Sequence, residues 1–179
     1  MYYPTLEQIK EIIKTGDYNL VPVCKEMYGD SITPIEVMRI LKKHSKHCYM
    51  LESVDDTKRW SRYTFMGYDP KSEITCLNNL MNVDGKEFMV THPKDYLKKL
   101  LKQYQSPKIA GLPTFTGGLV GYFAYDYFKY SEPVLNLKSD DKEGVNDVDL
   151  MLFDQVICFD NYKQKIVLIA NVAVDDLEK

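Results

Sequence analysis

The sequence predicts an α+β fold with largely antiparallel sheet and helices on the outside. Three segments carry helix start signals, and many other apolar residues alternate with polar ones, which is typical of half-buried strands. Several of these strands follow one another without an intervening helix, as in an antiparallel meander. A chain of 179 residues can bury a sizeable core without disulfides or a metal, so we expect one domain over residues 1–179.

Two helices begin with a capping box, at Thr5–Gln8 and Thr33–Glu36. In this motif the threonine hydroxyl accepts a hydrogen bond from the third backbone N–H, and the third side chain reaches back to the cap. Gly16 is expected to end the first helix in a left-handed turn, and the second should run to about His44. The expected core face of the second helix consists of Ile35, Met38 and Leu41.

A third helix is expected from Pro93 to about Tyr104, with an apolar stripe formed by Tyr96, Leu97, Leu100 and Leu101. Strands are expected at residues 20–27, 48–53, 62–68, 73–77, 87–90, 117–123, 150–159 and 166–174, and loops at 106–116 and 133–147. The pair Asp84-Gly85 tolerates positive φ angles and predicts a tight hairpin turn.

Two of the expected strands carry further information. Pro22 lacks a ladder donor, so its strand suits a sheet edge or an irregular segment. The run Ile166–Ala170 is apolar on both faces and must therefore be covered on both sides. Because it lies close to Lys179, we expect part of its covering layer to come from outside this chain.

Composition excludes several classes of function. The net charge of −3, with acidic and basic residues interspersed, gives no field that would attract nucleic acid. No apolar run reaches membrane-spanning length, and Met1–Pro4 lacks the basic start of a secretory signal, so we expect a cytoplasmic protein with no membrane contact. The widely spaced cysteines, with no C-x-x-C pair, are expected to be free thiols: Cys24, Cys48, Cys76 and Cys158.

The main candidate site is a predicted hairpin that carries Leu51, Glu52, Ser53, Arg62 and Tyr63. A carboxylate, a hydroxyl, a guanidinium and an aromatic ring on one hairpin are the groups needed to bind a zwitterion with an apolar side chain. From the pattern alone, the more ordinary interpretation is that Glu52 pairs with Arg62 across the hairpin while the aromatic rings pack in the core.

Two other motifs were considered as sites. Gly117, Gly118 and Gly121 could cradle a phosphate, but the segment lacks the G-x-x-x-x-G-K-[ST] pattern, so close backbone packing is the better explanation. His44 and His47 end one element and precede another, so their side chains need not converge on a metal. No serine or cysteine stands in a recognisable nucleophile motif, and we expect no catalytic, cofactor-binding or metal-binding residue in this segment.

An ordered set of motifs resembles the N-terminal half of anthranilate synthase component I, the chorismate-using lyase of tryptophan biosynthesis. In chain order, after the opening helix, the motifs are the strand around Pro22, Asp30-Ser31-Ile32-Thr33-Pro34, Leu51-Glu52-Ser53, Arg62-Tyr63-Thr64-Phe65-Met66-Gly67, Phe115-Thr116-Gly117-Gly118 with Gly121-Tyr122 and Tyr125-Asp126, and Asp147-Val148-Asp149 with Phe153-Asp154. Together they span nearly the whole chain. The resemblance implies that the sheets belong to the two-sheet α/β sandwich of that family.

The resemblance also implies a role for the candidate hairpin. In that family the Leu-Glu-Ser strand contributes to the feedback site for L-tryptophan, which assigns Leu51, Glu52 and Ser53 as effector-binding residues. Arg62, or Tyr63 beside it, is similar in position to a basic residue that lines the same site. The other wall of the pocket, the chorismate site, the Mg²⁺ ligands and the catalytic residues lie in the family's second half, which this sequence lacks.

The implied full-length enzyme converts chorismate and ammonia, delivered from glutamine by an amidotransferase subunit, into anthranilate and pyruvate. This chain alone would then be an inactive fragment. Component I of aminodeoxychorismate synthase, in the folate pathway, shares these motifs and stays open as an alternative. So does a stand-alone amino-acid-binding module.

Overall fold

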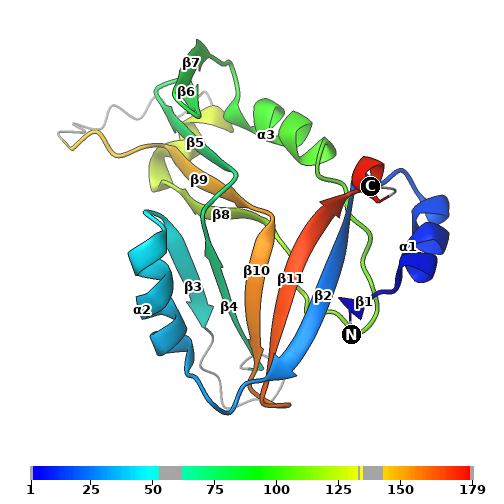
Figure 1. Cartoon of the computed structure of the whole chain (residues 1–179). Coiled ribbons are helices and arrows are strands. Elements are labelled where there is room, and N and C mark those ends of the chain that lie inside the picture. The colour runs from blue at the N-terminus through cyan, green and yellow to red at the C-terminus, as the bar shows by residue number, and fades with distance from the viewer. Residues whose placement is uncertain (1, 53–61, 133, 135–142, 178–179) are drawn as a thin grey trace. The chain divides into compact units, whose positions relative to one another are not determined.

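The computed structural model describes residues 2–52, 62–132, 134 and 143–177 (Figure 1). The chain folds into two compact units, and each unit is assembled from separate segments of the sequence. The first consists of residues 1–70, 104–118 and 153–179, and the second of residues 71–103 and 119–152. Each unit contains one sheet. This confirms the α+β class with largely antiparallel sheet; the single domain over residues 1–179 stays a prediction.

The sheet of the first unit has six strands in the order β1-β2-β11-β10-β4-β3. The elements of this unit are β1 (Tyr2–Tyr3), α1 (Leu6–Ile12), η1 (Ile13–Thr15), β2 (Leu20–Tyr28), α2 (Pro34–His44), β3 (Cys48–Glu52), β4 (Tyr63–Tyr68), β10 (Gln155–Asp160), β11 (Lys165–Ala173) and η3 (Val174–Asp176). The sheet of the second unit has five strands in the order β7-β6-β5-β9-β8. Its elements are β5 (Ser72–Leu77), β6 (Leu80–Val83), β7 (Lys86–Met89), α3 (Pro93–Lys102), β8 (Gly118–Phe123), η2 (Tyr125–Tyr130) and β9 (Val148–Phe153).

β11 is a central strand of the first unit and lies between β2 and β10. On one face of this sheet, Ile166 packs with Met66 and Phe159 against Leu41 of α2. On the other face the core is formed by Cys24, Val156, Cys158, Val167 and Ile169, with Leu112 and Phe115 from the segment that follows α3. Both faces of β11 are therefore partly covered, as its apolar pattern predicts, although Leu168 remains 39% exposed.

Both predicted capping boxes are present, at Thr5 with Gln8 and at Thr33 with Glu36. The expected left-handed turn at Gly16 is wrong, because α1 tightens into the 3-10 turn η1 and Gly16 is extended, with φ −170°. In α2, Leu41 is buried and Met38 packs beside it, but Ile35 is 58% exposed. Val37 packs against the core instead of Ile35. Val37 lies four residues before Leu41 and shares its helix face, whereas Ile35 lies six residues before Leu41 and does not.

The core of the second unit lies under α3. Leu97 is buried and packs with Tyr96 and Leu100 on a cluster formed by Ile74, Cys76, Met81, Val148 and Leu150. The predicted turn at Asp84-Gly85 is confirmed, with φ angles of 51° and 83° between paired β6 and β7. Leu101 is 45% exposed and does not belong to the buried stripe that the sequence predicts.

Two sequence predictions about strands were incomplete. The run 150–159 is not one strand, because β9 and β10 belong to different sheets and Asp154 separates them. The carbonyl of Asp154 accepts hydrogen bonds from the backbone and the side-chain amide of Asn171, at 2.9 and 3.0 Å. Strand β6 was missed, since it follows a second tight turn in which Asn78 and Asn79 both have positive φ.

Pro22 lies where the sheet is locally at its edge. β1 pairs only with Cys24 and Lys25, so β11 is the strand that pairs with Pro22, through Asn171. This arrangement confirms the prediction that Pro22, which has no backbone N–H to donate, lies at a sheet edge. The expected loop 133–147 falls mostly outside the described residues. Within the described part of the chain, the helices are too short and too polar to span a membrane.

Candidate functional site

The candidate hairpin is formed by β3 and β4, which pair antiparallel with Leu51 opposite Phe65 and Glu52 opposite Thr64. Leu51 is 47% exposed and Glu52 is exposed. Arg62 immediately precedes β4, while Ser53 lies outside the described residues. The structure therefore brings four of the five predicted residues to the same end of one two-stranded ribbon.

Arg62 forms a two-pronged ion pair with Asp160, the last residue of β10. Its Nε donates to Oδ1 at 3.0 Å and its Nη2 donates to Oδ2 at 2.6 Å. The guanidinium carbon also lies 4.8 Å from the ring centroid of Tyr63 and 5.8 Å from that of Tyr162. The guanidinium is thus held by one carboxylate and two aromatic rings.

This geometry corrects the ordinary interpretation in which Glu52 pairs with Arg62. Strand register explains the difference, because Asp160 stands opposite Tyr63 whereas Glu52 stands opposite Thr64. Successive side chains of a strand point to opposite faces, so Glu52 and Asp160 lie on opposite faces of the sheet. Arg62, at the strand end, bonds to the carboxylate on the face of Tyr63.

The ion pair between Arg62 and Asp160 shifts the pKa of both side chains. Burial alone would raise the pKa of Asp160, but hydrogen bonds from Arg62 and from the backbone N–H of Lys163 outweigh it and lower that pKa. The hydrogen bonds to Asp160 raise the pKa of Arg62. Asp160 is only 4% exposed, so its charge depends on these donors for compensation.

An aromatic layer lies on the same face as Leu51. Tyr49 contacts Phe153 and Phe115, with ring centroids 4.7 and 6.4 Å apart, and Phe65 contacts Phe115 at 5.6 Å. A Cβ at Gly67, opposite Tyr49, would overlap the tyrosine ring. The Tyr49 hydroxyl is buried, has no hydrogen-bond partner among the described residues, and has its pKa raised by burial. The layer packs β3 and β4 against Phe115 and Phe153.

The glycine motif is confirmed as a packing feature. A Cβ at Gly121 would overlap the backbone oxygen of Asp149 on β9. A Cβ at Gly117 would lie 2.7 Å from the Asn171 amide nitrogen and 2.9 Å from the Phe153 oxygen.

The histidine segment was the other candidate site in the sequence. No group of three or more His, Cys, Asp or Glu residues within the described ranges is placed to hold a metal ion.

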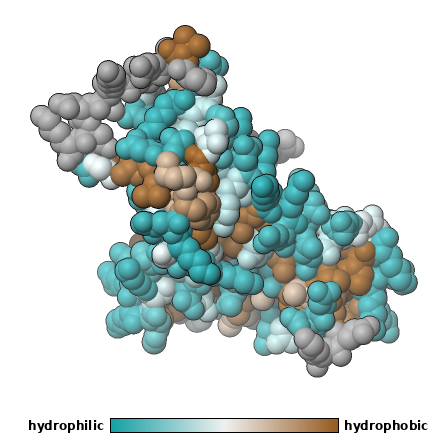
Figure 2. Space-filling model, turned by 90° about the horizontal axis from the view of Figure 1, so that it is seen from above, coloured by the Kyte–Doolittle hydropathy of each residue, from teal (hydrophilic) through white to brown (hydrophobic). Residues whose placement is uncertain are grey.

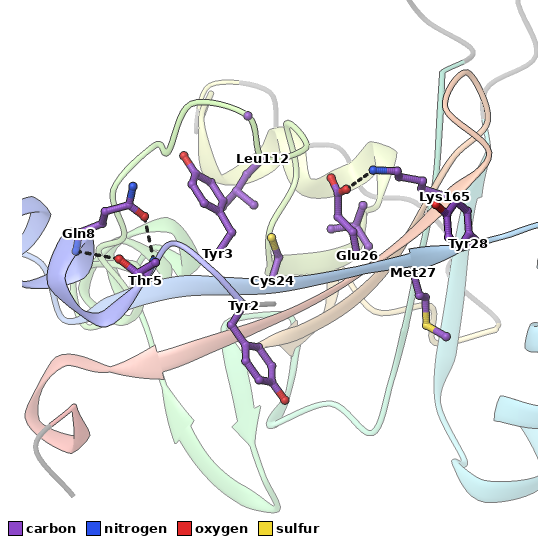
Figure 3. A pocket seen from close by; sticks show the side chains of 12 residues that line it. Tyr2, Tyr3, Thr5, Gln8, Cys24, Glu26, Met27, Tyr28, Leu112 and Lys165 are labelled. Carbon is purple, nitrogen blue, oxygen red and sulfur yellow. Dashed lines mark hydrogen bonds and ion pairs between the residues drawn. The ribbon is translucent and has the colours of Figure 1, made fainter.

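Sequence reasoning missed a groove of about 650 Å³ in the first unit. Figure 3 shows Tyr3 and Cys24 projecting toward Leu112, while Glu26 meets Lys165 in an ion pair at the other end. Tyr2 and Met27 point to the opposite side of the strands. Because β1, β2, β11 and the loop at Leu112 are far apart in sequence, no local pattern could have indicated this groove. Figure 2 shows one face of the molecule, on which hydrophobic clusters are separated by mostly hydrophilic residues.

No family model matches the chain. A crystal structure of anthranilate synthase component I from Streptococcus pneumoniae TIGR4 matches 85% of this chain and 33% of that chain, with a TM-score of 0.54 and 26% sequence identity. The chain therefore has the α+β fold of part of that protein.

Sequence relatives agree with the structural match. "Anthranilate synthase component 1" of Acetivibrio thermocellus is 34% identical over 98% of this chain and 35% of the relative. "Probable anthranilate synthase component 1" of Schizosaccharomyces pombe is 30% identical over 96% and 33%. "Anthranilate synthase alpha subunit 2, chloroplastic" of Arabidopsis thaliana is 33% identical over 97% and 31%. The chain is homologous to anthranilate synthase component I and spans about a third of the length of these relatives.

Proposed function

We propose that this chain is the regulatory portion of an anthranilate synthase component I and corresponds to its N-terminal third. The observation that carries the proposal is the homology to component I over 98% of the chain. We propose further that Leu51, Glu52, Ser53, Arg62 and Tyr63 form part of an effector site for L-tryptophan. The exposure of Leu51 and Glu52 at the end of the ribbon that carries Arg62 supports this assignment.

The proposed whole enzyme takes chorismate and glutamine-derived ammonia to anthranilate and pyruvate, with an amidotransferase subunit as partner, in the cytoplasm. The relatives named above are called anthranilate synthases, and the Arabidopsis one is named as chloroplastic. The described residues hold no acidic cluster that suits Mg²⁺. We therefore assign the metal, the chorismate site and the catalytic groups to the part of the enzyme that this chain does not span.

The chemistry of the proposed effector site follows from Arg62. Its bonds to Asp160 use Nε and Nη2, and a guanidinium has five N–H donors, so others are available to an effector carboxylate. Leu51 lies on the same face as the Arg62–Asp160 pair and offers apolar surface, whereas Glu52, the last residue of β3, offers its carboxylate to an ammonium group from the other face at the strand end. These are complementary to the two charges and the apolar side chain of an amino acid.

Inhibition by such an effector is a shift in population. An effector inhibits only if it binds one arrangement of the enzyme more tightly than another. A pocket shared between this chain and the catalytic portion would let L-tryptophan favour one orientation of the two. The pairing of β3 with β4 and their contacts with Phe153 and Phe115 support transmission of such a change through the sheet.

The test is made in the full-length protein with the variant Ser53→Ala. Ammonia-dependent anthranilate formation is measured while L-tryptophan is titrated. We expect the tryptophan concentration for half inhibition to rise about tenfold, the cost of one hydrogen bond to a charged group, with uninhibited turnover within about twofold. Ser31→Ala, at an exposed serine outside the site, is the matched control and should change neither quantity. Equal loss of inhibition and turnover would contradict the assignment.

A product assay separates the two enzyme candidates. The full-length protein is given chorismate and ammonia, and the products are resolved by chromatography. Anthranilate together with pyruvate supports the proposed function, whereas accumulation of aminodeoxychorismate assigns the chain to the alternative synthase. Absence of both products, in a protein that still binds amino acids, supports the stand-alone binding module.

A further inference from the structure

The second unit carries an apolar groove of about 390 Å³ between α3 and β8, which we call the α3–β8 groove. None of its residues belongs to the proposed effector site. It is lined by Lys94, Leu97, Lys98 and Leu101 of α3, by Leu119, Gly121 and Phe123 of β8, and by Tyr127 and Leu150.

The groove exists because α3 does not cover the whole apolar face of its sheet. The helix packs on the core through Leu97, while Leu101 remains 45% exposed. Leu119 and Phe123 stand at alternate positions of β8, and Gly121 contributes no side chain between them. Phe123 is 51% exposed. An apolar hollow is therefore open to a ligand.

The walls of the groove are held in place before any ligand binds. The ring of Tyr127 packs edge-on against Phe123, with centroids 4.9 Å apart. Burial raises the pKa of Tyr127, and the backbone of Lys94 at the start of α3 acts to lower it. Tyr127 of η2 therefore lines the groove together with Lys94 of α3 and Phe123 of β8.

Both charged side chains that line the groove are positive, although the whole chain carries −3 and the charge of Asp95, next to Lys94, acts on Tyr127 of the lining. Its lining includes Lys94 and Lys98 and no acidic side chain. Lys94 lies in the first turn of α3, where the helix dipole disfavours a cation. Neither lysine forms an ion pair with another residue in the described part of the chain. A lysine in an unfavourable position of its own helix is explained if it meets an anionic partner.

We propose that the α3–β8 groove docks an acidic amphipathic helix of a partner protein. Lys94 and Lys98 are one helical turn apart, which matches carboxylates at i and i+4 on a helix lying beside α3. Apolar side chains on the adjoining stripe of that helix fill the space over Gly121, between Leu101 and Phe123. The lysines set the partner's charge, and the apolar floor supplies the contact area.

The test uses the 179-residue chain and two labelled 18-residue helical peptides. Both carry leucines at helical spacing, and their flanking positions are glutamate in one peptide and lysine in the other. Fluorescence anisotropy measures the dissociation constants at about 50 and 300 mM salt. We expect the acidic peptide to bind at least tenfold more tightly than the basic one, and to bind more weakly at high salt.

Charge-reversed variants locate the binding. The double variant Lys94→Glu with Lys98→Glu should raise the dissociation constant of the acidic peptide at least tenfold. Lys99→Glu with Lys102→Glu, which makes the same charge change on α3 outside the groove lining, should change that dissociation constant less than twofold. Leu101→Ser should also weaken binding, and circular dichroism checks that each variant is folded. Equal binding of both peptides, or equal effects of the double reversals at Lys94 and Lys98 and at Lys99 and Lys102, would overturn the proposal. So would a dimer of the chain that Lys94→Glu abolishes, because the occupant would then be a second copy.

Discussion

At the scale of single residues, the Arg62–Asp160 pair joins the end of β4 to the end of β10. Removing Arg62 would leave a carboxylate that is 4% exposed without its main donor. Arg62→Ala is expected to lower the free energy of unfolding by about 2 kcal/mol, the cost of losing hydrogen bonds to a buried charge. Urea denaturation measures it. Arg39→Ala, at an exposed arginine, should cost less than about 0.5 kcal/mol. A similar cost for both variants would show that the pair is not stabilising.

The lowered pKa of Asp160 also predicts how stability depends on pH. Folding favours the ionised form, so this group contributes stability above its ordinary unfolded pKa of about 3.9. That contribution is lost as the pH falls through the lower folded pKa. Urea midpoints measured from pH 6 down to pH 2 should therefore fall less steeply at the acid end for Asp160→Asn than for the unaltered protein. Parallel curves would mean that the Asp160 carboxyl titrates alike in both states.

Residue-level prediction from the sequence was only partly successful, and distance along the chain explains why. The β3–β4 hairpin and its candidate residues followed from local alternation of polar and apolar side chains. The partner of Arg62 did not, because Asp160 is 98 positions away and the contact depends on the pairing of β4 with β10. The binding role of Ser53 stays a prediction, since that residue lies outside the described ones.

At the scale of elements, the approach of β8 to β9 depends on a single glycine. A Cβ at Gly121 would overlap the Asp149 oxygen, which is a backbone atom of β9 and cannot rotate away. Gly121→Ala is therefore expected to cost about 3 kcal/mol in free energy of unfolding. Gly85→Ala is the control, because its Cβ would meet no atom within 4 Å and only the positive φ is strained, at about 1 kcal/mol. Chemical denaturation of both variants tests this, and a larger loss at Gly85 would contradict it.

Elements with a local chemical signal were the ones that the sequence predicted well. The capping boxes marked the starts of α1 and α2, and Asp84-Gly85 marked the β6–β7 turn. The missed elements lack such signals or depend on tertiary context. Asn78-Asn79 turns tightly without a glycine, and η2 is held by the buried bond from the Tyr130 hydroxyl to Asp147, at 2.8 Å. Alternation of apolar residues continues through 150–159, so nothing local showed that the chain changes sheets at Asp154.

At the scale of the whole molecule, the fold class was predictable and the division into two units was not. Strands are visible in the alternation of apolar and polar residues along the sequence. Each unit, however, is assembled from segments that are separated by tens of residues. The ordered set of motifs indicated the family more strongly than any single motif, and the relatives confirm the resemblance. Since the chain spans about a third of those relatives, the proposed effector site is best tested by comparing this chain with the full-length protein.

L-Tryptophan should stabilise the full-length protein and have little effect on the isolated chain. A ligand that binds only the native state, present at 100 times its dissociation constant, adds about 2.7 kcal/mol to the free energy of unfolding. Scanning calorimetry should therefore show a higher Tm for the full-length protein with L-tryptophan, and no rise with D-tryptophan. At the same concentration the 179-residue chain should show almost no shift, because a pocket with one wall binds weakly. An equal shift in both proteins would place the complete pocket within this chain and rule out a shared one.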